Sequence, residues 1–397
     1  MNILLLAPQP FFQQRGTPIA VRMLAQELAA QGHAVDLLVF HEGEDVTMPG
    51  VTLHRTWSLP GVRNVPPGFS LKKVLCDGAM FFKCIGLLAR RRYDLIHAVE
   101  ESAFLALVLS KCSQVPYVYD MDSSMPEQIA DKWKLPGAVR WLLEMAECLA
   151  VRHSRGVVAV CRSLEDKARR FDPKKRVVRL EDVSLLEPVE TGPILRDELG
   201  IEGPIVLYVG NLESYQGIDL LLETFAHARR SKAEAHLVVI GGVREHIEHY
   251  RKISTDLGIA DAAHFVGPRP LSDLQWYLAQ ADVLVSPRTQ GNNTPMKIYS
   301  YLDSGRAVLA TRRTTHTQAL DDRIAMLADP EPEAMGAALV ELLRDGELRA
   351  RLATRARTRV AQEFSPQAFR RKLAEFYRNL EADLGAAQRP VGREARA

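Results

Sequence analysis

The sequence predicts an α/β protein built from two doubly wound parallel sheets, and three observations support this fold class. The chain has 397 residues, which is too long for one ordinary hydrophobic core and suits two domains. Short runs rich in leucine and β-branched residues alternate with helical patterns in both halves, as in repeated β-α units. These runs are apolar throughout, which is typical of strands that helices cover on both faces.

The first half contains six predicted strands and a well-marked first helix. The predicted strands are residues 3–7, 35–40, 51–54, 95–98, 116–119 and 157–160. An amphipathic pattern predicts a helix over residues 19–30, and Gly32 follows its end. Gly16, Thr17 and Pro18 precede this helix, and we expect Thr17 to be its N-cap and Pro18 its first residue.

The second half repeats this organisation. Its predicted strands are residues 205–209, 236–240, 264–266, 283–285, 307–310 and 324–327. Thr294 and Pro295 predict the start of a helix over residues 296–304, which Gly305 closes. Residues 181–204, rich in acidic residues, proline and glycine, connect the two halves.

The composition excludes several classes of function. The 51 Lys and Arg residues nearly balance the 49 Asp and Glu residues, so the net charge of +2 does not indicate nucleic-acid binding. The five cysteines are an odd number and form no C-x-x-C pair, which argues against a zinc site and a disulfide framework. The first apolar run has no basic leader, and no run approaches the roughly 18–20 apolar residues of a membrane span. We therefore expect a cytoplasmic protein.

Two cations near the second helix start predict an anion-binding site. A helix N-terminus carries a partial positive charge, so Lys297 in the first turn is disfavoured by about 0.3–1 kcal/mol. Arg288 lies on the loop that leads to the same helix, and Gly291 keeps this loop small. A bound diphosphate would account for both cations, because helix N-termini and cations favour phosphate. The alternative is that both are solvated surface side chains.

Several motifs resemble those of family 4 glycosyltransferases. In the second half these are LYVGNL at residues 207–212, QGIDLL at 216–221, ADVLVSP at 281–287 and TPMKIYSYLDSGRAVLAT at 294–311. In the first half they are GHAV at residues 32–35 and DLIHA at residues 94–98. The resemblance covers nearly the whole chain, and the motifs follow one another in the order and spacing of the family.

The resemblance implies the GT-B fold, in which two Rossmann-like domains face each other across a cleft. We expect an acceptor-binding domain over residues 1–186 and a nucleotide-sugar-binding domain over residues 187–364. Residues 365–384 would form a helix that crosses back onto the first domain. The chain then becomes small, basic and rich in proline and glycine, so residues 385–397 are expected to form a disordered tail.

The implied reaction is transfer of a hexosyl group from a nucleotide sugar to an acceptor hydroxyl, with retention of the anomeric configuration. The acceptor would be a polysaccharide, a lipid-linked glycan or a small-molecule glycoside. The resemblance also implies that no metal ion or other cofactor is required, because helix ends and cations hold the diphosphate in this family.

The sequence departs from the family pattern at the expected donor site. Asn211 and Gln216 replace the usual arginine and lysine after the first strand, and Asn292 and Ser300 replace two glutamates. Either the chain is a divergent but active enzyme, or it is a non-catalytic relative that binds a nucleotide or a partner protein. We favour an active enzyme, because polar side chains remain at all four positions, whereas an abandoned site would become apolar.

The expected donor site therefore combines two cations with neutral hydrogen-bonding residues. Arg288 and Lys297 would supply the charge that the departures remove. The expected diphosphate-binding residues are Arg288, Lys297, Asn293, Thr294 and Gln216. The expected residues for the donor sugar and ribose are Gly16, Thr17, Asn292 and Ser300, of which the first two belong to the glycine loop of the family.

Two carboxylates at the ends of first-half strands are candidates for catalysis. Asp122 stands where the family often has a histidine, and Glu101 follows the strand over residues 95–98. A carboxylate at either position could orient the acceptor or accept the proton of its hydroxyl. The alternative is that these side chains only cap loops or helices, and it applies above all to Glu101.

Residues 63–92 form a basic amphipathic segment. Seven Lys or Arg residues in these thirty positions are accompanied by one acidic residue, Asp77, and by many large apolar residues. Such a helix can lie on an anionic membrane surface, which would suit a lipid-linked acceptor and a peripheral position at the inner face of the membrane. The alternative is a helix that packs on the core and has a solvated cationic face.

Overall fold

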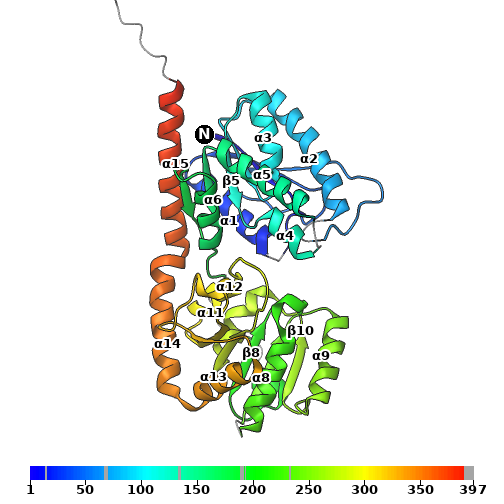
Figure 1. The fold of residues 1–397 in the computed structure, drawn as a ribbon, viewed down its shortest axis with the longest axis vertical. Coiled ribbons are helices and arrows are strands. Elements are labelled where there is room, and N and C mark those ends of the chain that lie inside the picture. The colour runs from blue at the N-terminus through cyan, green and yellow to red at the C-terminus, as the bar shows by residue number, and fades with distance from the viewer. Residues whose placement is uncertain are drawn as a thin grey trace, which may run out of the picture. The chain divides into compact units, whose positions relative to one another are not determined.

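The computed structural model describes residues 1–13, 16–66, 70–132, 136–187, 192, 194–231 and 234–388. The chain forms two compact units, and each is built around one parallel sheet (Figure 1). The first unit contains Met1–Glu181 and Arg370–Ala397, and the second contains Asp182–Phe369. The predicted α/β class with two doubly wound parallel sheets is therefore confirmed.

The first unit has a seven-stranded sheet in the order β3-β2-β1-β4-β5-β6-β7, and every neighbouring pair is parallel. Its strands are β1 (Asn2–Ala7), β2 (Ala34–Val39), β3 (Val51–Arg55), β4 (Leu95–Val99), β5 (Tyr117–Met121), β6 (Gly156–Ala159) and β7 (Val177–Arg179). The sequence predicts the first six. It misses β7, because this edge strand has only three residues, all of them half-buried, and one is charged.

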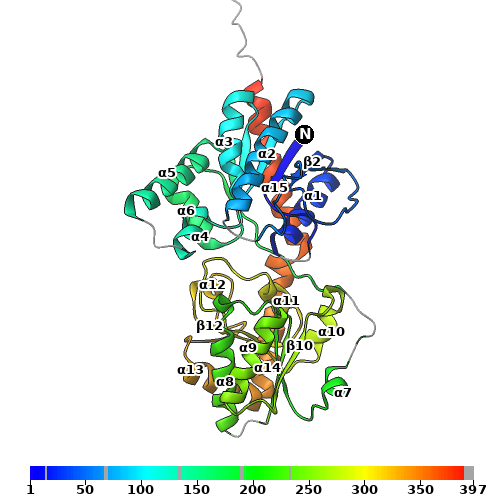
Figure 2. The same ribbon diagram turned by 90° about the vertical axis from the view of Figure 1, so that its right-hand side faces the viewer.

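Helices cover both faces of the first sheet. On one face, α2 (Leu71–Arg90), α3 (Ser102–Ser113), α5 (Gly137–His153) and α6 (Arg162–Phe171) share a core with alternate strand residues (Figure 2). The buried residues of α1 (Gly16–Ala30) are not part of that core, as expected for the helix on the opposite face. A short helix, α4 (Met125–Lys132), follows β5.

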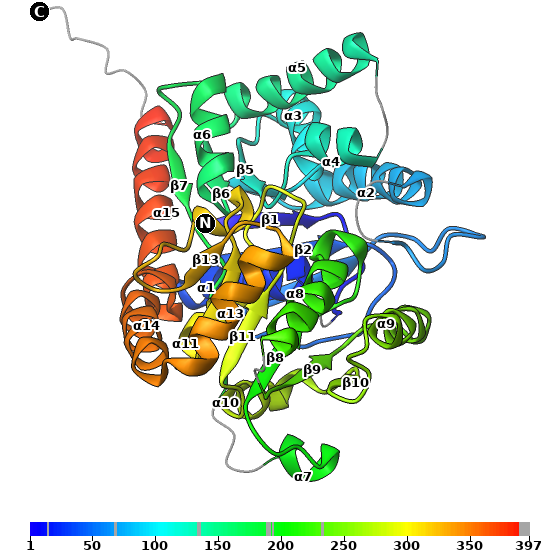
Figure 3. The same ribbon diagram turned by 60° about the horizontal axis from the view of Figure 1, so that its bottom comes forward.

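The second unit has a six-stranded parallel sheet in the order β10-β9-β8-β11-β12-β13 (Figure 3). Its strands are β8 (Ile205–Val209), β9 (His236–Ile240), β10 (Ala263–Gly267), β11 (Val283–Ser286), β12 (Ala307–Thr311) and β13 (Met326–Ala328). The two faces of the sheet have separate cores: Val206 and Tyr208 face one, and Ile205 and Leu207 face the other. This alternation explains why the strands read as continuous apolar runs in the sequence.

The second unit contains eight α-helices within the described residues. They are α7 (Leu195–Leu199), α8 (Ile218–Arg230), α9 (Arg244–Asp256), α10 (Leu274–Ala279), α11 (Lys297–Asp303), α12 (Thr314–Thr317), α13 (Pro332–Arg344) and α14 (Gly346–Arg359). The helix α11 is short, with seven residues, so side chains must carry most of any anion binding near its start.

Both expected N-caps are wrong. The helix α1 begins at Gly16, so Thr17 and Pro18 lie in its first turn. The helix α11 begins at Lys297 and follows Met296, so the helix starts later than a Thr294 cap requires. The loop before α11 is held instead by contacts with the loop after β8, among them the hydrogen bond from the Thr289 N–H to the Tyr215 carbonyl oxygen.

The last helix, α15 (Pro366–Gln388), starts in the second unit and runs along the first unit from Arg370 onwards. Tyr377 anchors it: the Tyr377 hydroxyl lies 2.6 Å from Nδ1 of His97, and Nε2 of the same ring lies 3.0 Å from Oδ2 of Asp120. The rings of His97 and Tyr377 are stacked. All three groups are buried, so the last helix is joined by hydrogen bonds to β4 and β5 in the interior of the first unit.

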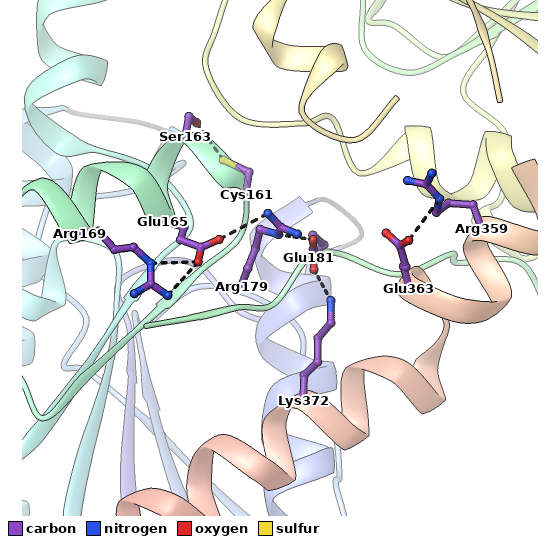
Figure 4. A network of polar contacts seen from close by, with 9 residues as sticks. All are labelled: Cys161, Ser163, Glu165, Arg169, Arg179, Glu181, Arg359, Glu363 and Lys372. Carbon is purple, nitrogen blue, oxygen red and sulfur yellow. Dashed lines mark hydrogen bonds and ion pairs between the residues drawn. The ribbon is translucent and has the colours of Figure 1, made fainter. Parts of the chain in front are cut away.

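A chain of ion pairs surrounds the point at which the backbone leaves the first unit (Figure 4). Glu181, the last residue of the first segment, lies 2.6 Å from Nζ of Lys372 and 2.6 Å from Nε of Arg179. Arg179 also contacts Glu165, which pairs with Arg169. Because Lys372 belongs to α15, these contacts join the outgoing and the returning segments of the chain within the first unit.

The C-terminal end continues the last helix further than the sequence predicts. Residues 385–388 belong to α15, so this part of the expected disordered tail is helical. The remainder of that expected tail, residues 389–397, lies outside the described residues. Among the helices in the described ranges, none is long and apolar enough to cross a membrane.

Candidate functional site

Two loops pack on each other at the carboxyl edge of the second sheet, one after β8 and one between β11 and α11. The backbone N–H of Thr289 donates to the carbonyl oxygen of Tyr215 over 3.2 Å. Gly217 has a φ of +75°, and a Cβ at this position would overlap the carbonyl oxygen of Pro287. Only glycine therefore allows this approach, which brings the side chains of both loops to one place.

The amine of Lys297 is buried there without a polar partner. Its Nζ has no hydrogen-bond partner and lies 3.9 Å from the centroid of the Tyr208 ring. Burial, and then the charge of Arg288, hold the pKa of Lys297 well below its ordinary value. A Cβ on Gly210 would come within 2.8 Å of this Nζ, so the glycine leaves room for the amine. An unpaired buried cation is costly, and a bound anion would remove that cost.

The guanidinium of Arg288 shares this environment. It lies over the ring of Tyr215, with Cζ 5.2 Å from the ring centroid. Its Nε donates to the carbonyl oxygen of Gln290 over 2.7 Å, and a terminal nitrogen donates to Oδ1 of Asn293 over 3.1 Å. Burial lowers its pKa. In the described part of the chain, neither Arg288 nor Lys297 forms an ion pair, and two neighbouring cations without a carboxylate indicate a site for an anion.

Neutral polar atoms without partners lie on the same two loops. Thr294 Oγ1 and Gln216 Oε1 are both buried and have no hydrogen-bond partner. Asn293 accepts from Arg288, and its carbonyl oxygen accepts from the Thr315 hydroxyl over 2.7 Å. The structure thus brings all five residues of the expected diphosphate site onto these two packed loops.

The four residues expected at the sugar and ribose are placed less uniformly. Asn292 is exposed on the loop before α11, and its carbonyl oxygen accepts from the side chain of Gln318 over 2.8 Å. Ser300 is buried, and its Oγ accepts from the backbone N–H of Leu185 over 3.0 Å. Gly16 and Thr17 lie in the first turn of α1, in the other unit. Ser300 can keep its bond to Leu185 and still donate its own hydroxyl hydrogen to a ligand.

Sequence reasoning missed one buried histidine that supports the site. Nε2 of His316 lies 2.9 Å from the Ser286 hydroxyl, and its Nδ1 lies 3.0 Å from the carbonyl oxygen of Thr311. The Thr311 hydroxyl in turn donates to the carbonyl oxygen of Arg288 over 2.6 Å. Burial lowers the pKa of His316 to about 3, so the ring is neutral and braces the Arg288 backbone without adding charge. The only sequence signal for this role is the position of His316, which follows β12 and the two arginines after that strand.

Sequence reasoning also missed the two aromatic rings below the cations. Tyr208 is fully buried in the strand β8, and Tyr215 is half-buried in the turn that follows. In the sequence, a tyrosine in a buried strand is typical of ordinary core packing. Only the structure shows that Lys297 lies over the Tyr208 ring and Arg288 over the Tyr215 ring.

The candidate carboxylates of the first unit follow two neighbouring strands. Asp122 comes directly after β5, and Glu101 lies two residues after β4. The Glu101 carboxylate is 2.6 Å from Nζ of Lys73, and the Glu100 carboxylate is 3.6 Å from the same atom. Burial raises the pKa of Glu101 to about 7, although Lys73 opposes this shift. Glu101 is therefore an ion-paired group with a pKa near neutrality.

The basic segment over residues 63–92 contains α2, and residues 67–69 of it lie outside the described residues. Lys73 does not belong to its cationic surface, because this side chain is buried and pairs with Glu101. Five apolar side chains of α2 are exposed nevertheless: Leu71, Val74, Leu75, Phe82 and Ile85. The helix thus packs on the core and also presents apolar side chains outwards.

Across the described residues, no three or more His, Cys, Asp or Glu side chains are grouped to hold a metal ion.

Two family models match this chain, one in each unit. Residues 15–181 match the glycosyl transferase 4-like domain, and residues 203–345 match glycosyl transferases group 1. The chain is 25% identical to a D-inositol 3-phosphate glycosyltransferase of Acidothermus cellulolyticus, over 85% of this chain and 80% of that protein. It is 23% identical to an alpha-monoglucosyldiacylglycerol synthase of Streptococcus pneumoniae, over 95% of this chain and 85% of that protein.

Solved structures with the same two-domain architecture are similar over almost the whole chain. A sucrose-phosphate synthase of Thermosynechococcus elongatus has a TM-score of 0.78 and 20% identity, and the match covers 96% of this chain and 99% of that one. HepE of Anabaena in complex with UDP has a TM-score of 0.75 and 17% identity, with 96% and 100% covered. HepE in complex with UDP-glucose has a TM-score of 0.73 and 18% identity, with 96% and 100% covered. These likenesses confirm the GT-B fold, with a Rossmann-like domain in each half.

Proposed function

We propose that the protein, a glycosyltransferase whose two halves match the glycosyl transferase 4-like and group 1 family models, moves a hexosyl group from a nucleotide sugar to an acceptor hydroxyl. The observation that carries this proposal is a pair of basic side chains at the carboxyl edge of the second sheet, the buried amine of Lys297 and the half-buried guanidinium of Arg288. Neither forms an ion pair within the described residues. In sugar transfer, negative charge builds up on the departing nucleoside diphosphate, and fixed cations stabilise that charge.

Uncharged atoms beside the cations suit the remainder of the donor. The unpartnered Oε1 of Gln216 can accept from a hydroxyl, and the unpartnered hydroxyl of Thr294 can donate to a phosphate oxygen. Asn292 is exposed, and we assign its amide to the donor sugar. Ser300 accepts from the N–H of Leu185 and can donate its own hydroxyl hydrogen to a ribose oxygen. The predicted roles of Gly16 and Thr17 at the donor remain part of this proposal.

The proposal includes retention of configuration and independence of metal ions. Retention follows from the resemblance to family 4, and the anomeric configuration of the product, read by proton NMR, tests it. Lys297 and Arg288 already place two positive groups where the diphosphate charge develops, so no further cation is required there. Transfer should proceed at an unchanged rate in EDTA, and a loss of rate that magnesium restores would refute this part.

For the acceptor, we propose that Asp122 or Glu101 orients the hydroxyl or accepts its proton. A pKa of about 7 suits Glu101 for proton transfer, but the ion pair with Lys73 holds its carboxylate in place. Asp122→Asn and Glu101→Gln keep the shape of each side chain and remove the base. A full transfer rate in either variant would exclude that carboxylate from proton transfer.

The proposed partner of the first unit is a membrane that carries a lipid-linked acceptor. Of the fourteen large apolar side chains exposed among the described residues, five lie on α2, one on α3 and five on α5. Those on α3 and α5 are Val108, Val139, Trp141, Leu142, Met145 and Leu149. The helices α2 and α5 both contact α3, which lies between them (Figures 2 and 3). Exposed basic side chains such as Lys72, Lys111 and Arg140 accompany this apolar surface, as expected for contact with anionic lipid.

Sedimentation with vesicles tests the membrane contact. The protein should co-sediment with vesicles that contain phosphatidylglycerol and remain in solution with vesicles of phosphatidylcholine alone. Phe82→Ser combined with Leu75→Ser should reduce the bound fraction, since both side chains are exposed on α2. Val243→Ser, at an exposed apolar residue of the second unit, is the matched control. Equal binding by all variants would show that α2 does not form the contact.

Nucleotide binding tests the donor site directly. UDP, GDP and ADP are compared by thermal shift, because a ligand at 100 times its dissociation constant adds about 2.7 kcal/mol to the free energy of unfolding. Lys297→Ala and Arg288→Ala should abolish most of the shift. Lys252→Ala and Arg230→Ala, at exposed positions on α9 and α8, are matched controls and should leave it unchanged. Unchanged binding in Lys297→Ala and Arg288→Ala would refute the site.

A panel of nucleotide sugars then separates an enzyme from a non-catalytic relative. Hydrolysis of one donor in the absence of acceptor, or transfer to a lipid extract, would show turnover. Nucleotide binding without any turnover across the panel would favour the non-catalytic alternative. The relatives described above are named as transferases and synthases, and these names support an active enzyme.

A further inference from the structure

We infer that Tyr208 and Tyr215 are positioning residues that hold the two cations of the donor site in place, and that Asn211 links their rings. This inference rests on the proposed function, because it assigns a role to residues that surround the proposed diphosphate site. None of the three side chains carries charge at neutral pH, and none is part of the expected diphosphate-binding set.

The geometry pairs each cation with one ring. Nζ of Lys297 lies 3.9 Å from the centroid of Tyr208, and Cζ of Arg288 lies 5.2 Å from the centroid of Tyr215. Both distances fall within the roughly 6 Å at which an aromatic face attracts a cation. Arg288 lies on the loop after β11 and Lys297 is the first residue of α11, whereas both rings come from β8 and the turn after it. The two loops are thus held together by contacts between a cation and a ring.

Asn211 touches both rings at their hydroxyl ends. The Tyr208 hydroxyl donates to the backbone carbonyl oxygen of Asn211 over 2.7 Å. The side-chain amide of Asn211 donates to the Tyr215 hydroxyl over 3.2 Å. One residue therefore sets the spacing of the two rings, and through them the spacing of Lys297 and Arg288.

Rings serve here better than carboxylates would. A carboxylate beside Lys297 or Arg288 would neutralise the cation and compete with the diphosphate for it. An aromatic face attracts a cation without cancelling its charge, so Arg288 stays available to a phosphate, as does Lys297 once a bound diphosphate has raised its pKa. The position of Asn211 is one where the family pattern has an arginine, and an arginine there would add a third positive charge beside two that are already unpaired. The neutral Asn211 fits a site whose charge comes from the other loop.

The other charged or titratable groups that face Lys297 include no carboxylate among the described residues. Facing Lys297 are Arg288 from its own loop, Tyr208 from β8 and His316 from α12. His316 is neutral because its pKa is lowered to about 3. The Tyr208 ring lies against the Lys297 amine, which has no hydrogen-bond partner among the described residues. The Tyr215 ring adds to the two hydrogen bonds that Arg288 donates to Gln290 and Asn293.

A double-mutant cycle on Tyr215 and Arg288 tests the inference, with UDP affinity measured by calorimetry. Tyr215 is half-buried, so Tyr215→Leu is tolerated better than a change at the fully buried Tyr208. We expect Tyr215→Leu to weaken UDP binding about two- to thirtyfold, and to have no further effect in an Arg288→Ala background. Tyr215→Phe retains the ring and should restore most of the affinity.

The link through Asn211 has its own test. Tyr215→Phe and Asn211→Ala both remove the hydrogen bond between Asn211 and Tyr215, so the losses of UDP affinity that come from this bond should not add. Asn211→Ala also removes the acceptor of the Glu213 backbone N–H, so its own effect should be the larger of the two. Circular dichroism and the melting temperature without UDP show that each variant is folded. A fully additive loss would mean that Asn211 and Tyr215 act independently, which overturns the link.

The outcomes distinguish the inference from the proposed function. If Tyr215→Leu loses affinity only when Arg288 is present, and Tyr215→Phe restores it, the inference holds. If Tyr215→Leu has no effect, or has the same effect with and without Arg288, the inference is wrong while the donor site stands. If neither Arg288→Ala nor Lys297→Ala lowers UDP affinity, the proposed donor site fails and the inference fails with it.

Discussion

Raising the pH should weaken the binding of a nucleoside diphosphate to this protein. In the empty site, burial and the charge of Arg288 keep the pKa of Lys297 well below its ordinary value. A bound diphosphate supplies the missing negative charge and raises that pKa, because an opposite charge favours the protonated amine. Between the two pKa values, binding takes up a proton, so the affinity falls as the pH rises. The fall approaches tenfold per pH unit, or about 1.36 kcal/mol, for one proton.

Other groups near Lys297 leave this signal clear. Burial lowers the pKa of His316 to about 3, so this ring stays neutral above pH 7. Burial also raises the pKa of Tyr208 well above its ordinary value, so its hydroxyl stays protonated up to pH 9. A fall in affinity with rising pH that Lys297→Arg abolishes would therefore report on Lys297.

Calorimetry of UDP binding at pH 7, 8 and 9 measures this effect. Buffers of different ionisation enthalpy give the number of protons taken up. Lys297→Arg keeps its charge over this range, so its affinity should not change with pH. Lys297→Met is never charged, so it should bind weakly and equally at each pH. Wild-type binding that is tight, independent of pH and free of proton uptake would refute the reasoning.

Three further predictions concern stability and the shape of the site. Lys297→Met should raise the melting temperature of the ligand-free protein at pH 7, because an unfolded lysine binds a proton that the buried one resists; the gain should shrink as the pH approaches about 10.4, the ordinary lysine value. Gly210→Ala should weaken UDP binding, because its Cβ would lie 2.8 Å from Nζ of Lys297 and displace the amine, and it should also lower the melting temperature, because the φ of +151° strains any residue with a Cβ. Tyr377→Phe should cost about 1–3 kcal/mol in urea unfolding, because it leaves the buried Nδ1 of His97 without its partner, and a cost near zero would contradict that bond.

Most of the strands were predictable from the sequence because their signal is local. Central parallel strands are apolar on both faces, so runs such as residues 205–209 are recognised without knowledge of their neighbours. The strand β7 has three half-buried residues at an edge and leaves no such run. The N-cap at Thr17 was wrong for a related reason, because capping residues predict a helix boundary only to within one or two residues.

The cations of the site were predictable because they lie close together in the sequence. The residues that contact them were not, because these come from distant segments of the chain. Lys297 and Arg288 are nine residues apart, so their common loop was visible in the sequence. Tyr208 lies on another strand, and only the fold places its ring under Lys297. Likewise, Lys73 reads as a surface cation, but its partner Glu101 comes 28 residues later and fixes it in the interior.

The return of α15 to the first unit has a consequence for biosynthesis. Residues that complete this unit, among them Phe376 and Tyr377, leave the ribosome only after the whole second unit has been made. Until then the nascent first unit lacks the helix that covers His97 and packs against Gly156. The second unit is continuous in sequence and can close on its own. We therefore expect the later half of the chain to fold first, and an isolated fragment that ends at residue 181 to expose an apolar face and aggregate.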